Sequence, residues 1–105
     1  MPKYLLAYHG GHVDETPAGI KKVMEAFGKW FAELGPALAD PGNPVGRTCT
    51  VDHNGNVSEG GGANPVSGYS IIEAASIEEA IDMVKRGPIV QGGRSVEVAE
   101  TFSPL

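Results

Sequence analysis

Histidine is the side chain in this sequence best suited to chemistry, because it changes charge near neutral pH. His9 and His12 flank two glycines, and His9 ends a strand expected over residues 3–9. There it borders glycine-rich loops, where the general acid or base of a small pocket could lie. As metal ligands the two histidines would need a third partner, which His53 or Asp14 could supply only by folding close. We therefore expect no metal site, and we treat His9 as catalytic only under an enzymatic interpretation. The alternative is a strand end and a solvated loop.

Arg47 is the second candidate, because it alternates with Val45, Cys49 and Val51 along a strand expected over residues 45–52. A guanidinium on an apolar strand face must be paired, lie at a strand end, or await an anionic ligand such as a carboxylate. This position predicts a small carboxylate-bearing ligand. Cys49 is interpreted as a small buried hydrophobic residue rather than a nucleophile, since no histidine stands at a useful spacing.

The glycine run at residues 60–62 offers few side chains and is costly to order. It is either a loop or a place where the backbone closely approaches a ligand. It lacks the Gly-Lys-Ser/Thr ending of a phosphate loop and leads into a strand. We expect Gly61 and Asn64 to contribute to the pocket, with turn formation as the alternative for Asn64. Trp30 is expected to form an apolar wall there, with core packing as its alternative.

The last third of the chain predicts the scaffold most clearly. Residues 68–75 form a strand rich in β-branched and aromatic side chains. Ser76 and Glu79 then have the spacing of a capping box for a helix over residues 77–86. A Gly-Pro pair stops that helix, and a strand over residues 94–100 follows. Strand, helix and strand joined this tightly predict two strands in one sheet with a right-handed crossover.

The first part of the chain also predicts a strand followed by a helix. After the strand at 3–9, a Thr-Pro start and a wide apolar stripe predict a helix over residues 17–34. Residues 40–44 are all of types that favour turns, so a turn is expected there. The strand at 45–52 then reaches a hairpin signal with a short return near residues 57–59. The expected order is therefore βαββαβ, an α+β ferredoxin-like sandwich.

Composition limits the class of protein. A chain of 105 residues with 41% hydrophobic and 20% charged residues predicts one globular domain, spanning residues 1–105. The net charge of −5 argues against nucleic acid as a partner. No signal peptide and no apolar run long enough for a membrane span are expected. A single cysteine excludes an internal disulfide framework, and we expect a cytoplasmic protein without a cofactor.

The sheet is expected to be apolar on both faces. Both sides of each strand are largely hydrophobic. In the first strand Tyr4, Leu6 and Tyr8 point one way and Leu5 and Ala7 the other, and in the strand at 68–75 Tyr69 and Ile71 point one way and Ile72 and Ala74 the other. Small monomers rarely expose such a face, so two sheets packed face to face in a symmetric homodimer are expected.

Motifs spread over the whole chain carry a family resemblance: Lys3-Tyr-Leu-Leu-Ala-Tyr8, Trp30…Leu34-Gly35, Gly68-Tyr-Ser-Ile-Ile-Glu-Ala74 with Ser76-Ile-Glu-Glu-Ala80, Gly87-Pro88, and Gly93…Val96-Glu97-Val98. With these motifs the chain resembles the YCII-related domain proteins, a family of small bacterial proteins. The resemblance implies a ferredoxin-like fold that forms a dimeric α/β barrel. It implies no particular activity, because most of the family has none established.

The sequence departs from this family in two places. Many relatives have an Asp-Gly-Pro-Phe signature before the third strand, where this chain has Glu59-Gly60-Gly61-Gly62. Members suspected of catalysis have a histidine in the first helix, paired with an aspartate, and the helix expected at 17–34 has no histidine. The resemblance therefore extends to the fold and the dimer rather than to catalysis.

Two functions from different classes follow. The first is a homodimeric small-molecule-binding or accessory protein, with a small polar pocket at the sheet end lined by His9, Trp30, Arg47, Gly61 and Asn64. The second is a cofactor-free enzyme that uses His9 with a carboxylate on a small metabolite. Geometry discriminates them, since the enzyme requires His9 within hydrogen-bond reach of a carboxylate in a closed pocket. The carboxylates considered for that role are Asp40, Glu59 and Glu73.

Overall fold

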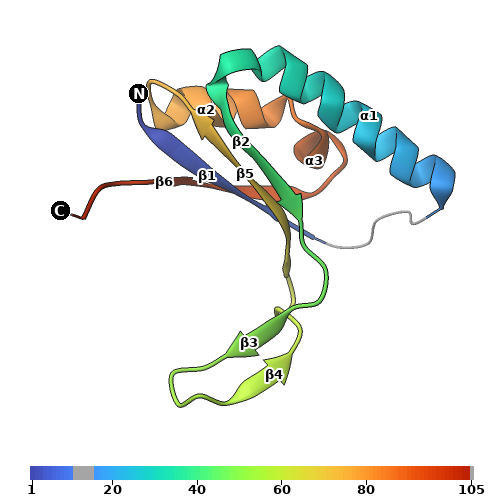
Figure 1. The fold of residues 1–105 in the computed structure, drawn as a ribbon, viewed down its shortest axis with the longest axis vertical. Helices are drawn as coiled ribbons and strands as arrows, with labels where there is room; N and C mark the ends of the chain where they lie inside the picture. Colours follow the sequence, from blue (N-terminus) through green and yellow to red (C-terminus); the bar gives the residue numbers. More distant parts are fainter. Residues whose placement is uncertain (11–15, 105) are drawn as a thin grey trace.

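The structure is a computed structural model, and it describes residues 1–10 and 16–104. Three helices lie on one face of a four-stranded sheet, and a separate two-stranded hairpin projects away from this body (Figure 1). The elements in chain order are β1 (Lys3–His9), α1 (Pro17–Leu34), the 3-10 turn η1 (Gly35–Ala37), β2 (Leu38–Pro44), β3 (Cys49–Val51), β4 (Val57–Glu59), β5 (Val66–Glu73), α2 (Ile77–Lys85), α3 (Pro88–Gln91) and β6 (Ser95–Glu100).

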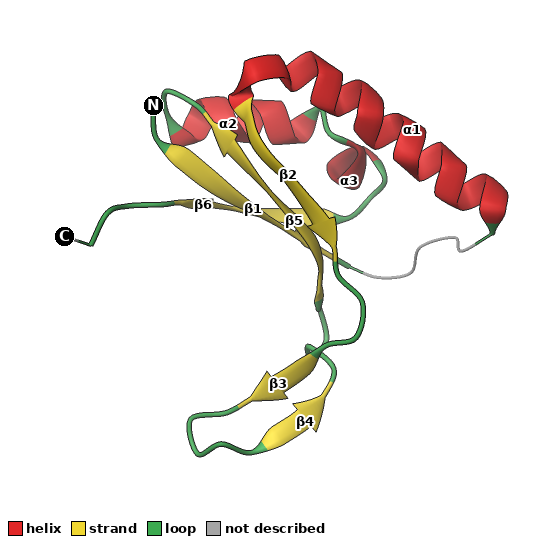
Figure 2. Ribbon diagram, viewed as in Figure 1, coloured by secondary structure: helices red, strands yellow, loops and turns green. Residues whose placement is uncertain are grey.

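The main sheet has the strand order β2-β5-β1-β6, and all three neighbouring pairs are antiparallel. The prediction that the strands near residues 68–75 and 94–100 share one sheet is confirmed, since β5 and β6 flank β1. The α+β class is also confirmed, and this order is compatible with a ferredoxin-like fold. Figure 2 shows the helices gathered on one side of the sheet only.

The strand predicted over residues 45–52 is confirmed only over Cys49–Val51 (β3), and its predicted place in the main sheet is wrong. The edge strand of the main sheet is β2, in the segment interpreted from sequence as a turn. Prolines are tolerated there because an edge strand pairs on one side only and needs few of its N–H groups. The pairing of β2 with β5 also shifts register twice, between Leu38 and Asp40 and between Asp40 and Asn43. A strand with such irregular pairing can contain proline, glycine and aspartate, which is why the residues of β2 were interpreted as a turn.

Gly42 marks the closest approach of these two strands. Its φ is 68°, and a Cβ built there would lie 1.7 Å from the carbonyl oxygen of Tyr69. The Gly42 N–H donates to Asp40 Oδ1 at 2.8 Å, which supports the same local bend. Only glycine fits this site, because it lacks the Cβ and adopts positive φ freely.

The hairpin signal at residues 53–56 is correct, but its strands do not join the main sheet. β3 and β4 pair only with each other, and Cys49 stands opposite Glu59 and Val51 opposite Val57. The carboxylate of Asp52 closes the turn by accepting the N–H groups of Asn54 and Asn56, each at 2.9 Å.

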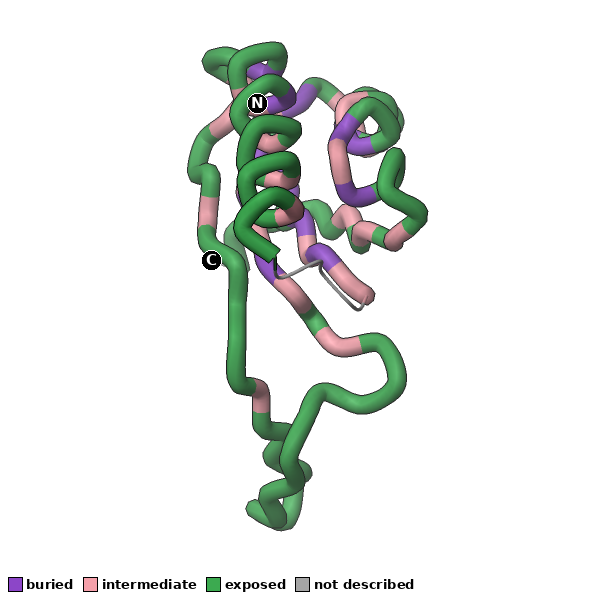
Figure 3. Tube along the Cα trace, turned by 90° about the vertical axis from the view of Figure 1, so that its right-hand side faces the viewer, coloured by how far each residue is buried: buried purple, intermediate pink, exposed green. Residues whose placement is uncertain are grey.

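The hydrophobic core lies between the sheet and the helices (Figure 3). Every second residue of β1 points into it, namely Tyr4, Leu6 and Tyr8, as alternation along a strand requires. The other buried apolar residues are Trp30, Leu34, Ile72, Ala74, Ala80, Val84 and Ile89. The α1 stripe predicted from sequence therefore packs on the sheet through its C-terminal half, where Trp30 and Leu34 are buried.

Both ends of α2 follow the expected chemistry, but a further helix begins directly after it. The Ser76 hydroxyl accepts the Glu79 N–H at 3.2 Å and caps α2, as predicted. The Gly-Pro pair ends α2, but Pro88 then begins the short helix α3, which the sequence interpretation missed. Proline suits a first helical position, where its missing N–H is not needed.

The opposite face of the main sheet has no helix over it among the described residues (Figure 1). Leu5, Ala7 and Ile71 lie on this uncovered face, and Leu5 is 38% exposed. The prediction of an apolar second face is confirmed for these residues.

Candidate functional site

His9 ends β1 on the uncovered face of the sheet, since its neighbour Tyr8 points into the core. Its side chain is only 14% exposed, although no helix covers it. The register of β1 against β5 shifts between Tyr8 and His9. An irregularity of this kind changes the direction of the strand locally and re-aims the following side chain.

The backbone of the glycine loop fixes one side of the imidazole. His9 Nδ1 lies 2.9 Å from the carbonyl oxygen of Asn64. A carbonyl oxygen only accepts, so Nδ1 carries the proton and donates it there. The neighbouring Gly10 N–H donates to the Pro65 carbonyl at 3.3 Å, which ties the end of β1 to the same loop. The other ring nitrogen, Nε2, is thereby left for chemistry.

Glu97 on β6 faces that second nitrogen. Its Oε1 lies 2.7 Å from His9 Nε2, within ion-pair distance when the ring is protonated. The contact between Nε2 and Oε1 does not have hydrogen-bond geometry. Nε2 is buried and has no hydrogen-bond partner among the described residues. Glu97 is 73% exposed, so the pair joins a largely covered ring to a solvent-facing carboxylate. Such a pair can donate, accept or move one proton at Nε2.

Glu97 is the functional residue that the sequence interpretation missed. The three carboxylates considered for His9 lie elsewhere: Asp40 accepts the Gly42 N–H, Glu59 pairs with Arg47, and Glu73 stands opposite Lys3 at the far end of β1. The signal was present in the strand pairing, because His9 stands opposite Ser95 and Ala7 opposite Glu97. A glutamate two residues from the opposing position is a diagonal neighbour on the same face.

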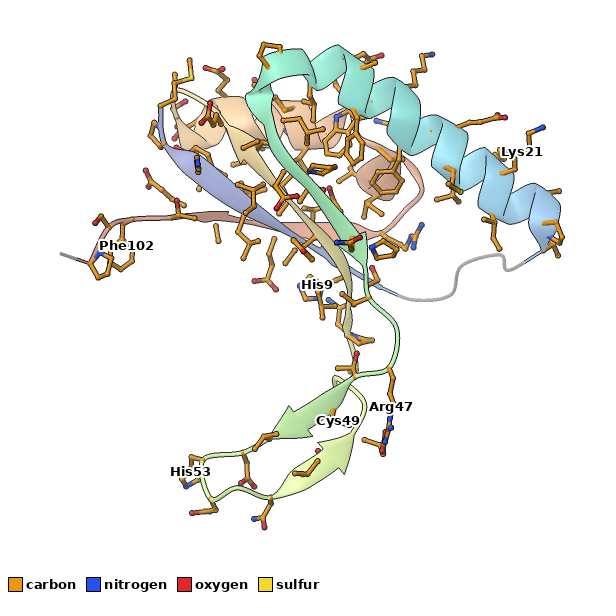
Figure 4. All side chains as sticks on the ribbon, in the orientation of Figure 1. His9, Lys21, Arg47, Cys49, His53 and Phe102 are labelled. Atoms are coloured by element: carbon orange, nitrogen blue, oxygen red, sulfur yellow. The ribbon has the colours of Figure 1, made fainter. Side chains whose placement is uncertain are left out.

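Arg47 does not lie in a strand and is not brought to His9. Its guanidinium is 81% exposed and donates to Glu59 Oε1 at 2.8 Å. Figure 4 shows Arg47 at the root of the projecting hairpin and His9 under the sheet, well apart. The expected apolar strand face around Arg47 does not exist, because residues 45–48 connect β2 to the hairpin instead.

Trp30 is also separate from His9, because it lies in the core on the helix side of the sheet. It is 4% exposed, and its Nε1–H donates to the Met83 carbonyl at 3.0 Å. Its indole packs against Phe27 and Phe31. The alternative interpretation, core packing with a partner for the indole N–H, describes Trp30 correctly, and the pocket-wall interpretation is corrected.

The glycine loop meets the site through its backbone. Asn64 contributes its carbonyl to His9, while its side chain is exposed at a loop position. Gly61 packs within the loop, and a Cβ there would lie 2.9 Å from Pro65 Cβ. Of the five predicted site residues, His9 and Asn64 are therefore in contact, and Arg47 and Trp30 lie apart from them.

The remaining reactive side chains form no second site in the described part of the chain. Cys49 is exposed, which corrects its interpretation as a buried residue. His53 lies in the hairpin turn, and His12 and Asp14 fall outside the described residues. Within residues 1–10 and 16–104, no three His, Cys, Asp or Glu side chains are grouped to hold a metal ion.

No family model, curated protein or solved structure matches this chain. Among the helices that the structure describes, none has the length and apolar character needed to cross a bilayer.

Proposed function

We propose that this chain is a YCII-related, cytoplasmic bacterial protein that forms a homodimeric α/β barrel and binds a small polar molecule at the His9 end of its sheet. The observation that supports this most is the placing of His9 between the Asn64 carbonyl and the Glu97 carboxylate, on a sheet face without a helix over it. The ferredoxin-compatible strand order and the apolar character of that face support the barrel.

The chemistry of the site favours a ligand with a hydroxyl or amine group. His9 Nε2 has no hydrogen-bond partner among the described residues, and Glu97 offers an exposed carboxylate beside it. With the proton on Nδ1, Nε2 and the Glu97 carboxylate are both acceptors, so a ligand hydroxyl can donate to either group, and an amine can donate to both and is attracted to the carboxylate. The carboxylate-bearing ligand expected from Arg47 loses its support, because that guanidinium already pairs with Glu59.

Thermal melting with a panel of small polyols, amines and carboxylates tests the binding site. A probe at ten times its dissociation constant should stabilise the fold by about 1.4 kcal/mol, or several degrees of melting temperature for a chain of this size. The shift should disappear in His9→Gln and in Glu97→Gln. It should persist in the control variants His53→Ala and Arg47→Ala, which change an exposed histidine and an exposed cation away from the site.

Equal shifts in the His9→Gln and His53→Ala proteins would contradict the proposed site. A shift that disappears only in Arg47→Ala would restore the carboxylate ligand and place binding at the root of the hairpin instead.

The second candidate is a cofactor-free enzyme in which His9 and Glu97 act on a small metabolite. The specific observation in its favour is the 2.7 Å separation of Nε2 and Oε1, with the ring oriented through Nδ1 by a carbonyl. Recovery of a bound probe after incubation discriminates the two functions. The enzyme should convert the probe, with conversion lost in His9→Gln, whereas a binding protein should return it unchanged.

A further inference from the structure

The hairpin formed by β3 and β4 has one face that is apolar next to its turn and one polar face. Residues directly opposite each other share a face, so Val51 and Val57 lie on one side next to the turn, together with Cys49 and its opposite residue Glu59 at the root. Thr50 and Ser58 occupy the other side. Alternation of this kind is typical of a hairpin that buries one face. In the single chain, however, Val51 and Val57 are 64% and 66% exposed.

The hairpin has little support from its own chain. Its strands pair only with each other, and every residue from Cys49 to Gly62 is exposed. Figure 1 shows it extended below the main sheet rather than packed on it. A two-stranded hairpin alone in water is only marginally stable, so an ordered one needs a surface to lie on.

The exposed surface of the chain is large enough for a missing partner. The chain exposes 7098 Å², whereas a folded monomer of 10.9 kDa exposes about 5,600 Å². The excess is about 1,500 Å², and a stable protein–protein interface covers about 800 Å² on each partner. The radius of gyration, 14.9 Å, is likewise larger than the value of about 13 Å for a compact domain of this length.

The second exposed surface of the chain lies next to the root of the hairpin. The segment from β4 to β5 passes Asn64, which holds His9, and the uncovered sheet face extends from there through Leu5 and Ile71. The sheet face and the hairpin border one concave side of the molecule (Figure 4). Because one chain carries both surfaces, a two-fold axis can pair them twice in one dimer.

We propose that the β3–β4 hairpin of one copy lies across the uncovered sheet face of a second copy and closes that copy's His9–Glu97 site, with the reciprocal contact at the other end. The inference rests on the proposed function for the identity of that site, and it adds that each site is completed by the partner chain. The valine pair of the hairpin would exclude water from His9 Nε2 and Glu97, which strengthens polar contacts to a ligand.

Cross-linking between differently marked chains tests this contact. One chain keeps the native Cys49, and the second carries Cys49→Ser together with Ser95→Cys, which stands opposite His9 on the uncovered face. A disulfide between Cys49 and the new cysteine can form only between copies. We expect the co-expressed chains, mildly oxidised at micromolar concentration, to give a covalent heterodimer on a non-reducing gel.

The matched control replaces Ser95→Cys by Asp82→Cys, an exposed position on α2 at the helix side. This chain should give at most one tenth of the covalent heterodimer. Equal yields from the two positions, or no heterodimer with the Ser95→Cys chain, would overturn the hairpin contact.

A second variant keeps the test independent of cysteine chemistry. Val51→Ser with Val57→Ser changes only exposed side chains, so the fold should survive, as circular dichroism would verify. The dimer dissociation constant should rise at least tenfold, while Ser58→Ala on the polar face should leave it within twofold. An unchanged dissociation constant, or a wild-type monomer at 100 micromolar, overturns the hairpin exchange.

These outcomes separate the inference from the proposed function. A dimer that is insensitive to the valine changes, yet binds a probe through His9, overturns the exchange and leaves the binding site intact. A heterodimer cross-linked through Cys49 that binds no probe supports the exchange and overturns the small-molecule function.

Discussion

At the residue scale, a chain of hydroxyl groups crosses three strands beneath the helices. Tyr8 donates to Ser70 Oγ at 2.6 Å, and Ser70 donates to the Pro41 carbonyl at 2.7 Å. Ser70 is the one fully buried polar residue in the described part of the chain. Burial raises the pKa of Tyr8 above its usual value, so the phenol stays a donor at physiological pH. This chain of hydrogen bonds ties the irregular β2 to the regular pair β1–β5.

Ser70→Ala should lower the free energy of unfolding by about 1–3 kcal/mol, because it leaves the Tyr8 hydroxyl and the Pro41 carbonyl without their partner. Urea denaturation measures the loss. Tyr8→Phe provides the control in a double-mutant cycle, since it removes the other end of the same bond. Strictly additive losses in the double variant would show that the two hydroxyls do not act together.

In the candidate site, some residues could be predicted from the sequence and others could not. His9 was identifiable from its type, its place at a strand end and the glycine loop beside it. Glu97 was not, because its relation to His9 comes from the pairing of strands almost ninety positions apart in the chain, and local spacing does not reveal it. The pocket role predicted for Arg47 failed because it assumed that Arg47 lies in a strand of the main sheet. That edge strand forms at Leu38–Pro44 instead.

At the element scale, β2 depends on a single glycine. Gly42→Ala should cost about 3 kcal/mol or more, because its Cβ would overlap the Tyr69 carbonyl and the backbone has positive φ. Gly46→Ala is the matched control, four residues away with no atom within 4 Å of its Cβ, and should stay within about 0.5 kcal/mol. Comparable midpoints in urea for the two variants would refute the close approach.

The hairpin turn depends on the charge of Asp52. Hydrogen bonds from the backbone N–H groups of Asn56 and Asn54 hold the pKa of this carboxyl below its usual range. A lowered folded pKa stabilises the turn above the unfolded value of about 3.9, and this stabilisation is lost as pH falls through the folded pKa.

Amide chemical shifts of Asn54 and Asn56 should therefore change cooperatively below about pH 4, as the carboxylate is protonated. In Asp52→Asn the same transition should be absent. A transition of equal size in the variant would assign it to another group.

Elements with strong local signals were predictable, and the edge strand was not. The capped helix α2 and strand β5 follow from a serine cap and a β-branched run, within one or two residues of their predicted bounds. β2 combines proline, glycine and aspartate, which local chemistry assigns to turns. It is a strand only because β5 offers it a pairing partner, and that tertiary contact has no local signature.

At the scale of the whole molecule, the class of fold was predictable, and the shape was not. The order of strands and helices follows from periodicity, and the strand pairing is compatible with the ferredoxin-like arrangement. The projection of the hairpin away from the sheet was not foreseen, nor was the flat shape of the molecule, which measures 46 × 40 × 19 Å. Sequence patterns report which face of an element is apolar, but they do not report which chain covers it.

Light scattering at micromolar concentration should give about twice the chain mass of 10.9 kDa. The physical reason is the unshielded apolar surface of the sheet and hairpin. Dilution into the nanomolar range should shift the mass toward the monomer, since the interface is then below its dissociation constant. A single chain mass at all concentrations would contradict the dimer.

The proline-containing edge strand β2 also bears on aggregation. An exposed sheet edge is a template for adding further strands, and proline weakens that template because it offers no N–H group. Pro41 and Pro44 blunt the β2 edge, whereas the opposite edge strand, β6, contains no proline. There Glu97 and Glu100 supply the repelling charge. Removing the Glu97 carboxylate would therefore also weaken the protection of this sheet against growth into fibrils along β6.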